Sequence, residues 1–213
     1  MPELQQLFIE FLIENHALKF GEFKLKSGRI SPYFFNLGVF NSGKTLAKLA
    51  EFYAETLIKS RMHCDRLFGP AYKGIPLVAA TSIILFEKFN KNMPYCFNRK
   101  EAKDHGDKGN FVGAELNGNV VMLDDVITAG TTVRETVSLL QHTEATLSGI
   151  IIAFDRQERA DGKLSAVQES AKKYNLPIQS IVTLSDVVQY LSQRKEFKKH
   201  LDAIERYRKE YGA

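Results

Sequence analysis

The feature that most constrains the fold is an apolar stretch that ends in a polar turn and leads into a helical stretch, a unit that occurs twice. "DRLFGPAYKG" (65–74) precedes an apolar helix from Ile75 to Phe89, and "NVVMLDDVITAGTT" (119–132) precedes a helix from about 131 to 142. A third apolar stretch, "SGIIIAFDRQER" (148–159), also ends in charged residues. Strands that are apolar throughout and alternate with helices are typical of a parallel sheet covered on both faces. The sequence therefore predicts an α/β fold with a central, mainly parallel, twisted sheet flanked by helices.

The polar ends of these three strands predict where a ligand binds. Ligands of open parallel sheets lie just beyond the carboxyl ends of the strands. Those ends are Gly69 to Gly74, Asp124 to Thr132 and Asp155-Arg156. We therefore expect all three segments at one edge of the sheet.

The remaining elements fit one domain over residues 1–213. "MPYCFN" (93–98) and "IQSIVTL" (178–184) predict further strands, and "RKEAKDHGDKGNFVG" (99–113) a mobile polar loop. Apolar residues at helical spacing predict helices over residues 3–15 and 43–60 and in two stretches at the end of the chain. "KFGEFKLKSGRISPYFFN" (19–36) predicts a β-hairpin added to the core, because aromatic and polar residues alternate around a Ser-Gly turn.

Composition and charge exclude several classes of protein. The longest apolar run, Ile75 to Phe86, is shorter than the roughly 20 residues of a membrane span. The first residues lack a basic segment leading into an apolar one, so no secretory signal is expected. The net charge is 29 − 25 = +4, and the basic C-terminal stretch contains interspersed acids, so neither predicts a nucleic-acid partner. Cys64 and Cys96 have no partner at metal-ligand spacing, which favours buried thiols in a reducing cytoplasm.

"GVFNSGKT" (38–45) matches the phosphate-loop pattern G-x-x-x-x-G-K-[ST], which raises the hypothesis of a nucleoside triphosphatase. The pattern requires a strand before it and a helix after it, and both neighbouring stretches could supply them. However, Val39 and Phe40 are bulky inside a loop whose backbone would have to surround phosphate. The hypothesis also leaves the polar ends of the other strands without a role. We therefore predict that Gly43-Lys44-Thr45 is only a helix start.

"VVMLDDVITAGTT" (120–132) combines two acids with a small, hydroxyl-rich turn at a helix start. The N–H groups of a helix N-terminus have no intrahelical partner, and the helix dipole favours an anion there. Asp124 and Asp125 would repel phosphate but could accept hydrogen bonds from sugar hydroxyls or orient water around magnesium. The alternative is an Asp cap with a threonine-rich first turn. The acids and the turn together favour a site for a sugar phosphate.

This stretch resembles the phosphoribosyl-diphosphate (PRPP) motif of the type I phosphoribosyltransferases. "KSGRISPYFFN" (26–36), "FGPAYKGIP" (68–76), "FNRKEAKDHG" (97–106) and "DRQER" (155–159) are similar, in the same order, to the bacterial orotate phosphoribosyltransferases. The resemblance spans essentially the whole chain. It implies the type I phosphoribosyltransferase fold, with residues of about 1–40 forming a hood over the base pocket. It also implies magnesium-dependent transfer of phosphoribose from PRPP to orotate in pyrimidine (UMP) biosynthesis, by a cytoplasmic homodimer.

The same resemblance assigns the residues that bind PRPP. Thr128 to Thr132 would hold the 5-phosphate, the two acids would face the ribose, and "GPAYKG" would hold the diphosphate around a non-proline cis peptide at Ala71-Tyr72. The residues carried over for PRPP are Lys26, Tyr72, Lys73, Arg99, Lys100, Lys103, His105, Asp124, Asp125, Val126, Ile127, Thr128, Ala129, Gly130, Thr131 and Thr132. No direct protein ligand for the metal is expected, because PRPP and water would hold most of the magnesium shell.

The basic segment "RKEAKDHGDKG" (99–109) is either a solvated charged loop or a lid for the leaving diphosphate. The resemblance favours the lid and implies that residues 99–110 act on the active site of the neighbouring subunit. The residues it assigns to catalysis are Arg99, Lys100, Lys103, His105 and Asp125.

The orotate pocket needs a cation, because orotate is a uracil ring that carries a carboxylate. Arg156 could supply it with fork geometry, although a simple ion pair with Asp155 or Glu158 is the alternative. The residues assigned to orotate are Lys26, Phe34, Phe35, Thr128 and Arg156, although the two phenylalanines alone would more often be core residues. Other functions that remain open are a PRPP-binding regulator and a purine phosphoribosyltransferase. No nucleic-acid or membrane partner is expected.

Overall fold

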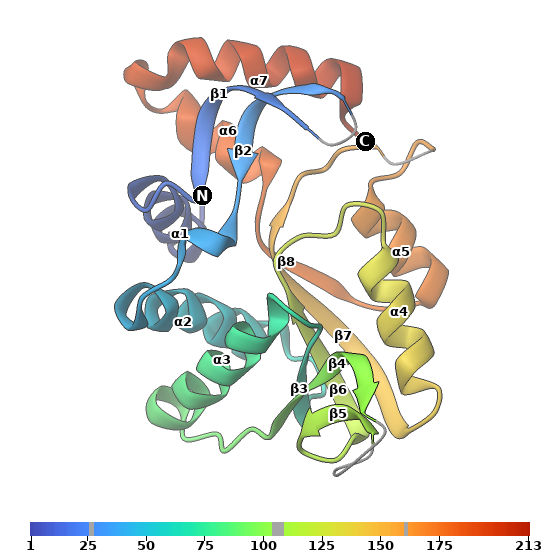
Figure 1. Cartoon of the computed structure of the whole chain (residues 1–213). Helices are drawn as coiled ribbons and strands as arrows, with labels where there is room; N and C mark the ends of the chain where they lie inside the picture. The colour runs from blue at the N-terminus through green and yellow to red at the C-terminus, as the bar shows by residue number, and fades with distance from the viewer. Residues whose placement is uncertain (26–27, 104–108, 160–161) are drawn as a thin grey trace.

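The computed structural model describes residues 1–25, 28–103, 109–159 and 162–213, and of residues 102, 103 and 109 only the main chain. Its centre is a six-stranded sheet in the order β5-β4-β3-β6-β7-β8. All neighbouring strands are parallel except β4 and β5, which form an antiparallel edge. The strands are β3 (Arg66–Gly69), β4 (Tyr95–Lys103), β5 (Gly109–Gly113), β6 (Asn117–Asp124), β7 (Glu144–Asp155) and β8 (Ile178–Thr183). The predicted α/β fold is therefore confirmed (Figure 1).

Helices cover both faces of this sheet, as Figure 1 shows with α2 and α3 on one side and α4 and α5 on the other. The helices are α1 (Glu3–Glu14), α2 (Gly43–Ser60), α3 (Gly74–Phe89), α4 (Thr131–Leu140), α5 (Ala166–Tyr174), α6 (Leu184–Ser192) and α7 (Lys198–Tyr211), with short 3-10 turns at Leu37–Val39 and Lys195–Phe197. Side chains on alternating sides of the strands enter two separate cores. Val121 and Ile151 face the first helices, whereas Val120 and Ile150 face α4 and α5. Burial on both faces explains why these strands are apolar throughout.

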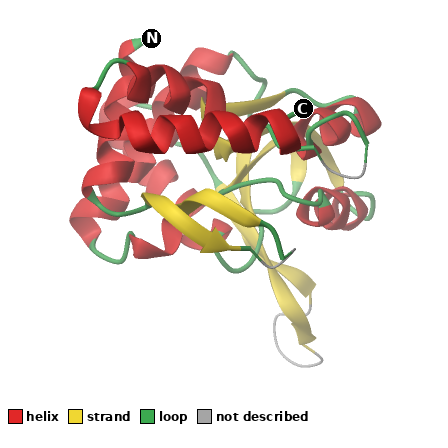
Figure 2. Ribbon diagram, turned by 90° about the horizontal axis from the view of Figure 1, so that it is seen from above, coloured by secondary structure: helices red, strands yellow, loops and turns green. Residues whose placement is uncertain are grey.

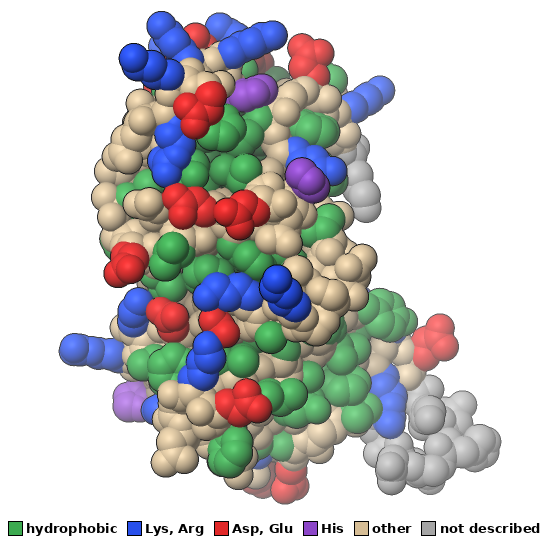
Figure 3. Space-filling view, turned by 90° about the vertical axis from the view of Figure 1, so that its left-hand side faces the viewer, with side chains coloured by type: hydrophobic (Ala, Val, Ile, Leu, Met, Phe, Trp, Pro, Cys, Tyr) green, Lys and Arg blue, Asp and Glu red, His purple; other side chains and the backbone are tan. Residues whose placement is uncertain are grey.

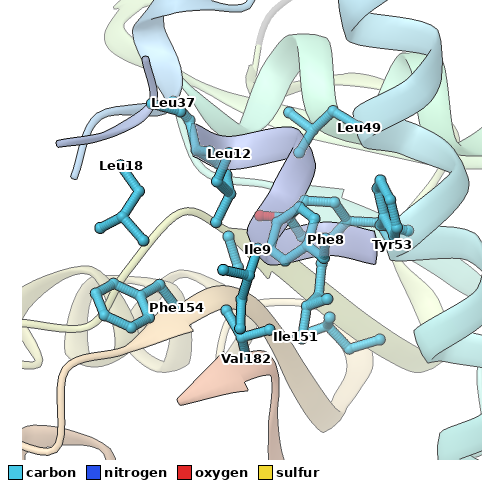
Figure 4. Close-up of a cluster of buried hydrophobic side chains, with 14 of the residues drawn as sticks. Phe8, Ile9, Leu12, Leu18, Leu37, Leu49, Tyr53, Ile151, Phe154 and Val182 are labelled. Carbon is cyan, nitrogen blue, oxygen red and sulfur yellow. The ribbon is translucent and has the colours of Figure 1, made fainter. Parts of the chain in front are cut away.

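α1 closes the larger of the two cores. Phe8, Ile9 and Leu12 lie on one face of this helix and are fully buried. Figure 4 shows them between the side chains of the central strands, such as Ile151, and those of α2. The apolar spacing over residues 3–15 thus predicted both the helix and the face that it buries.

The predicted hairpin near the N-terminus forms a small sheet of its own, β1 (Leu18–Lys24) and β2 (Ile30–Phe35), paired antiparallel. It lies against α7 at the top of the molecule, apart from the central sheet (Figures 1 and 2). Aromatic contacts join the two parts: Tyr33 of β2 meets Phe154 of β7 and Tyr207 of α7 edge to face. The hairpin is therefore an addition fixed to the core.

The prediction of a loop over residues 99–113 was wrong for the described residues on both sides. β4 continues to Lys103, and β5 pairs with it antiparallel from Gly109 to Gly113. Phe111 explains the pairing, because its ring packs edge to face against buried Phe68. The charged residues of β4 follow Phe97, the last residue that pairs with β3, so this part of the strand pairs only with β5 and its charge did not exclude a strand. The sequence analysis also did not identify α5, which a capping box between Ser165 and Gln168 begins.

Among the described helices, none combines the length with the apolar composition that crossing a bilayer requires.

Candidate active site

Three polar turns meet at the carboxyl edge of the sheet, as predicted. β3, β6 and β7 lie side by side in parallel and end at Gly69, Asp124 and Asp155. The turns that follow these strands therefore emerge on the same edge, below the hood formed by β1 and β2 (Figure 1). This edge is the candidate site.

The two acids at the end of β6 are almost fully buried, with Asp124 6% and Asp125 8% exposed. Asp124 Oδ1 accepts a hydrogen bond from the Asp125 N–H (2.9 Å), and Asp125 Oδ1 accepts one from the Val126 N–H (2.8 Å). Beneath them, the buried hydroxyl of Tyr53 donates to the Asp124 carbonyl (2.7 Å). Burial, followed by the negative charge of Asp125, raises the pKa of Asp124 to about 7. The pair is held rigidly and can present acceptor oxygens to hydroxyl groups.

The turn after β3 has an unusual backbone that the sequence analysis predicted. The peptide bond between Ala71 and Tyr72 is cis. The Ala71 N–H donates to Asn98 Oδ1 of β4 (2.8 Å), which holds the turn in place. A Cβ atom at Gly69 would lie 2.3 Å from the carbonyl oxygen of Gly74, so the two ends of the turn approach closely only because both are glycine.

Lys73 of this turn reaches across to the acids. Its Nζ lies 2.6 Å from Asp125 Oδ2, which brings the predicted diphosphate turn and the predicted ribose acids together. The Lys73 side chain is mostly exposed, so an anion can reach it. Two segments whose ends lie 52 residues apart in the sequence thus form one site.

The segment between β6 and α4 has the backbone geometry expected of a phosphate-binding turn. Gly130 is left-handed (φ 65°) and precedes the first turn of α4, and none of the described side chains caps that helix. Thr128, Ala129 and Thr131 are exposed, so their N–H and hydroxyl groups face solvent at the positive end of the helix dipole. The side chains of Val126 and Ile127 instead pack into the two cores, so these residues can contribute only main-chain groups.

Two of the basic residues of β4 lie near these turns. Arg99, Lys100 and Tyr72 line one cavity of about 370 Å³. Lys100 also lies beside Thr132 in a smaller cavity between β4 and α4. The proposed roles of Lys26, Lys103 and His105 rest on side chains outside the described residues.

The predicted orotate residues are distributed over β2 and the end of β7. Phe34 is exposed and stacks on Phe23, whereas Phe35 packs against Phe154. Neighbouring residues of a strand point to opposite faces, so the two rings cannot lie together against one base. Both residues can still present main-chain groups to a base. Arg156 Nη2 lies 2.7 Å from Glu158 Oε1. This ion pair is one of the alternatives that the sequence analysis considered for Arg156.

The phosphate-loop pattern is a helix start, as predicted. Ser42 caps α2 by accepting a hydrogen bond from the Thr45 N–H (3.3 Å), and Lys44 lies exposed in the first turn. Phe40 is buried and stacks on Phe11 with ring centroids 4.8 Å apart. The strand before the pattern belongs to the hairpin and not to the central sheet.

Sequence reasoning did not find two supporting residues, Asn98 and Tyr53, or the contact between Glu158 and Tyr33. Asn98 could have been noticed as the only amide that ends the apolar stretch "PYCF". Tyr53 gave no signal, because a tyrosine on a helix face is ordinary. Glu158 was considered only as an ion-pair partner of Arg156, and nothing in the sequence indicated its hydrogen bond with Tyr33. The roles of Tyr53 and Glu158 depend on contacts with residues 71 and 125 positions away in the chain.

Comparison with known proteins agrees with this geometry. Residues 39–180 match the family model described as the phosphoribosyl transferase domain. The chain therefore belongs to the phosphoribosyltransferase family, the class that its fold and site define. Within this family it is similar over its full length to orotate phosphoribosyltransferases from Photorhabdus laumondii (54% identical) and Proteus mirabilis (52% identical), each aligned over 212 residues covering 100% of this chain and at least 99% of the relative. The crystal structure of the orotate phosphoribosyltransferase of Francisella tularensis matches with a TM-score of 0.89 and 45% identity, over 97% of this chain and 100% of that one.

Proposed function

We propose that the protein is an orotate phosphoribosyltransferase, which converts orotate and PRPP into orotidine 5′-phosphate and diphosphate in pyrimidine (UMP) biosynthesis. One observation carries the proposal: two buried acids, an uncapped helix N-terminus and a tight turn with an exposed lysine share one edge of the sheet. These three parts fit the ribose hydroxyls, the 5-phosphate and the diphosphate of PRPP. The names of the full-length relatives support the same reaction.

In the proposed reaction the bond between the anomeric carbon and the diphosphate oxygen breaks, and its electron pair leaves with diphosphate. The ring nitrogen of orotate then forms the new bond to that carbon from the opposite face, and its N–H proton is released to water or to the diphosphate product. Positive charge develops on the ribose between these events, so the protein acts chiefly by alignment and electrostatics. Asp124 and Asp125 fix the ribose, and the α4 N-terminus fixes the 5-phosphate.

The lysine and arginine side chains accommodate the leaving group. Lys73 forms an ion pair with Asp125, and a diphosphate oxygen would replace this carboxylate as its partner. Arg99, Lys100, Lys103 and His105 supply further cations, and either of the last two can donate a proton to the departing oxygen. This role is proposed for residues 99–110 as a lid.

Arg156 is proposed to bind the carboxylate of orotate, with Lys26, Thr128 and the main chain of Phe34 and Phe35 around the ring. A neutral purine gives no reason for an arginine here, and a regulator that only senses PRPP needs no acceptor pocket. The partly buried guanidinium therefore favours orotate.

Magnesium fits the donor set of the site. Asp124 and Asp125 offer acceptor oxygens that could orient water molecules around the ion, without binding it directly. The other ligands would come from the oxygens of PRPP and from water, in line with the preference of magnesium for substrate phosphates over a cage of protein ligands. When bound, it would neutralise diphosphate charge.

The proposed enzyme is a homodimer, and α3 supports this part. Its sequence is largely apolar, and Ile83 and Phe86 are each 57% exposed. Ala79, Ile83 and Phe86 follow one stripe of the helix at spacings of four and three residues. Figure 3, which views the side of the molecule that carries α2 and α3, shows hydrophobic side chains exposed between scattered charges. A second copy of the chain would cover this stripe.

We place the enzyme in the cytoplasm, in agreement with its two free cysteines. The decisive experiment follows the absorbance of orotate in the presence of PRPP and magnesium, for the wild type and for Arg156→Ala. We expect orotate consumption that depends on PRPP, and an orotate affinity that is at least about tenfold weaker in the variant. Turnover of adenine, guanine or hypoxanthine in place of orotate would contradict the proposal. So would binding of PRPP without transfer to any base.

A further inference from the structure

Arg156 is held by a buried group of side chains that none of the proposed binding roles uses. Its Nε and Nη2 both donate to Glu158 Oε1, at 3.0 and 2.7 Å. The same oxygen accepts a third hydrogen bond, from the hydroxyl of Tyr33 at 2.6 Å. The guanidinium carbon lies 4.9 Å from the centre of the Tyr33 ring. One carboxylate oxygen and one ring therefore fix both the position and the plane of the guanidinium.

Little of this group is accessible to solvent. The side chains of Arg156 and Glu158 are 15% and 14% exposed, and Tyr33 is fully buried. The segment that carries both charges is also fixed by the end of the chain, since the Arg159 N–H donates to the Tyr211 carbonyl (2.8 Å) and the Ala213 N–H donates to the Gln157 carbonyl (2.9 Å). Groups that are anchored from β2, β7 and the C-terminal residues cannot reorient independently.

The donor geometry of arginine shows what this arrangement leaves for a ligand. A guanidinium has five N–H donors in one plane, and Glu158 takes the edge formed by Nε and Nη2. The second edge, formed by Nη1 and Nη2, has the spacing that binds a carboxylate through two parallel hydrogen bonds. A free arginine would have to lose side-chain entropy to present this edge, whereas Arg156 is already ordered.

We propose that Glu158, anchored by Tyr33, is a positioning residue that aims the second edge of Arg156 at the carboxylate of the acceptor base and so sets the preference for a carboxylated pyrimidine. This inference rests on the proposed function, in which Arg156 binds that carboxylate. The inference adds Glu158 and Tyr33 as the residues through which Arg156 selects a base that carries a carboxylate. Neither Glu158 nor Tyr33 touches the base itself.

Glu158→Gln and Tyr33→Phe test the inference. Glutamine retains the size and one acceptor oxygen of Glu158 but removes the charge, and phenylalanine retains the ring of Tyr33 but removes its hydroxyl. Titration calorimetry would give the affinity of each variant for orotate, for uracil and for PRPP. Uracil has the same ring without the carboxylate, so it reports any general damage to the pocket. We expect orotate binding to weaken by about tenfold in Glu158→Gln and by somewhat less in Tyr33→Phe, with uracil and PRPP binding changed less than about twofold.

Glu10→Gln is a matched control. Arg194 Nη2 pairs with Glu10 Oε1 at 3.0 Å, and the Arg194 guanidinium lies 3.6 Å from the centre of the Tyr190 ring. This group of Arg, Glu and Tyr joins α1 to α6 and contains none of the proposed site residues. Glu10→Gln should leave the affinities for orotate, uracil and PRPP unchanged, and thermal unfolding of all variants would identify any loss of fold.

The outcomes separate the inference from the function on which it rests. If Arg156→Ala weakens orotate binding but Glu158→Gln and Tyr33→Phe do not, the positioning role is wrong and the function stands. Equal weakening for orotate and uracil would mean that Glu158 is only structural. Tighter orotate binding in Glu158→Gln would mean that Glu158 competes with the substrate, and would also overturn the inference. If the wild type does not use orotate, the proposed function fails first.

Discussion

Lys73 Nζ lies 2.6 Å from Asp125 Oδ2, so the cation of one turn pairs with the acid of another. The lysine is mostly exposed and the acid is buried. Because solvent surrounds the lysine, screening limits the contribution of this half-exposed pair to about 1 kcal/mol. The contact is therefore weak enough for diphosphate to replace it, and it keeps the lysine beside the site until then.

Lys73→Met, which retains much of the length of the chain without the charge, tests this interpretation. We expect the KM for PRPP to rise by about tenfold or more, because a charge-assisted hydrogen bond to diphosphate is lost. The free energy of unfolding should change by less than about 1 kcal/mol. Steady-state kinetics with varied PRPP and urea unfolding would measure both. An unchanged KM for PRPP would remove Lys73 from the diphosphate site.

Asp124 makes the stability of the fold depend on pH in an unusual direction. Burial raises the pKa of its carboxyl in the folded protein to about 7, against an ordinary value of 3.8. Between these values the folded state binds more protons than the unfolded chain, so this group's contribution to the free energy of unfolding falls as pH rises. The stabilising contribution is fully present below about pH 4 and is lost through pH 7.

Asp124→Asn should remove this dependence. The difference in the free energy of unfolding between the variant and the wild type should shift in favour of the variant from pH 5 to pH 8, by an amount on the order of a few kcal/mol. Urea unfolding at the two pH values and one protein concentration would measure it. Asp202→Asn, at an exposed position on α7, controls for the change in net charge. If both variants show the same pH dependence as the wild type, Asp124 is ionised throughout this range.

Lys44→Ala tests the rejected phosphate loop. Lys44 is exposed in the first turn of α2, after a strand of the hairpin and a buried Phe40. We expect kcat/KM for phosphoribosyl transfer to remain within about twofold of the wild type, because a surface substitution away from the site changes little. The orotate absorbance assay gives the value directly. A loss of several orders of magnitude with the fold preserved would restore the triphosphatase hypothesis.

Phe86→Lys tests the proposed dimer. A charge at the end of the exposed stripe on α3 would be costly to bury against a second copy. We expect the variant to sediment as a monomer at concentrations at which the wild type is a dimer. Glu87→Lys, at an exposed neighbouring position, makes a larger change in charge beside the stripe and should remain dimeric. A Phe86→Lys dimer as stable as the wild type would place the interface elsewhere.

The parts of the fold that sequence predicted are those with a simple periodic signal. β6 and β7 are apolar on both faces, and α1 has one apolar face, so both could be recognised without tertiary information. β5 could not, because residues 109–113 form a strand only by pairing with β4 and packing Phe111 on Phe68. The same distinction holds in the site. The 124–132 turn is a continuous motif, whereas the anchoring of Arg156 depends on Tyr33 from a different sheet.

The proposed lid can be tested with mixed dimers, because a residue that acts across the interface can be supplied by either subunit. Lys103→Ala should lower kcat far more than it raises the KM for orotate, and Lys73→Met should impair PRPP use in its own subunit. When the two variants are dissociated together and reassociated at random, about half of the dimers contain one subunit of each kind. In such a dimer the site with an intact Lys73 receives an intact Lys103 from its neighbour.

The recovered activity then distinguishes the two arrangements. The assay is run at a PRPP concentration well below the KM of Lys73→Met, so that sites without Lys73 contribute little. If residues 99–110 act on the neighbouring site, one site in each mixed dimer is complete, and the mixture recovers about a quarter of the wild-type rate. If the segment acts on its own subunit, every site in a mixed dimer lacks either Lys73 or Lys103, and the rate stays at the level of the two variants reassociated separately. Reassociating each variant with itself is the control for incomplete refolding. A dimer in which each site is built from one subunit would show no recovery. Recovery of activity is therefore evidence for a site shared between the subunits, and not merely for a dimer.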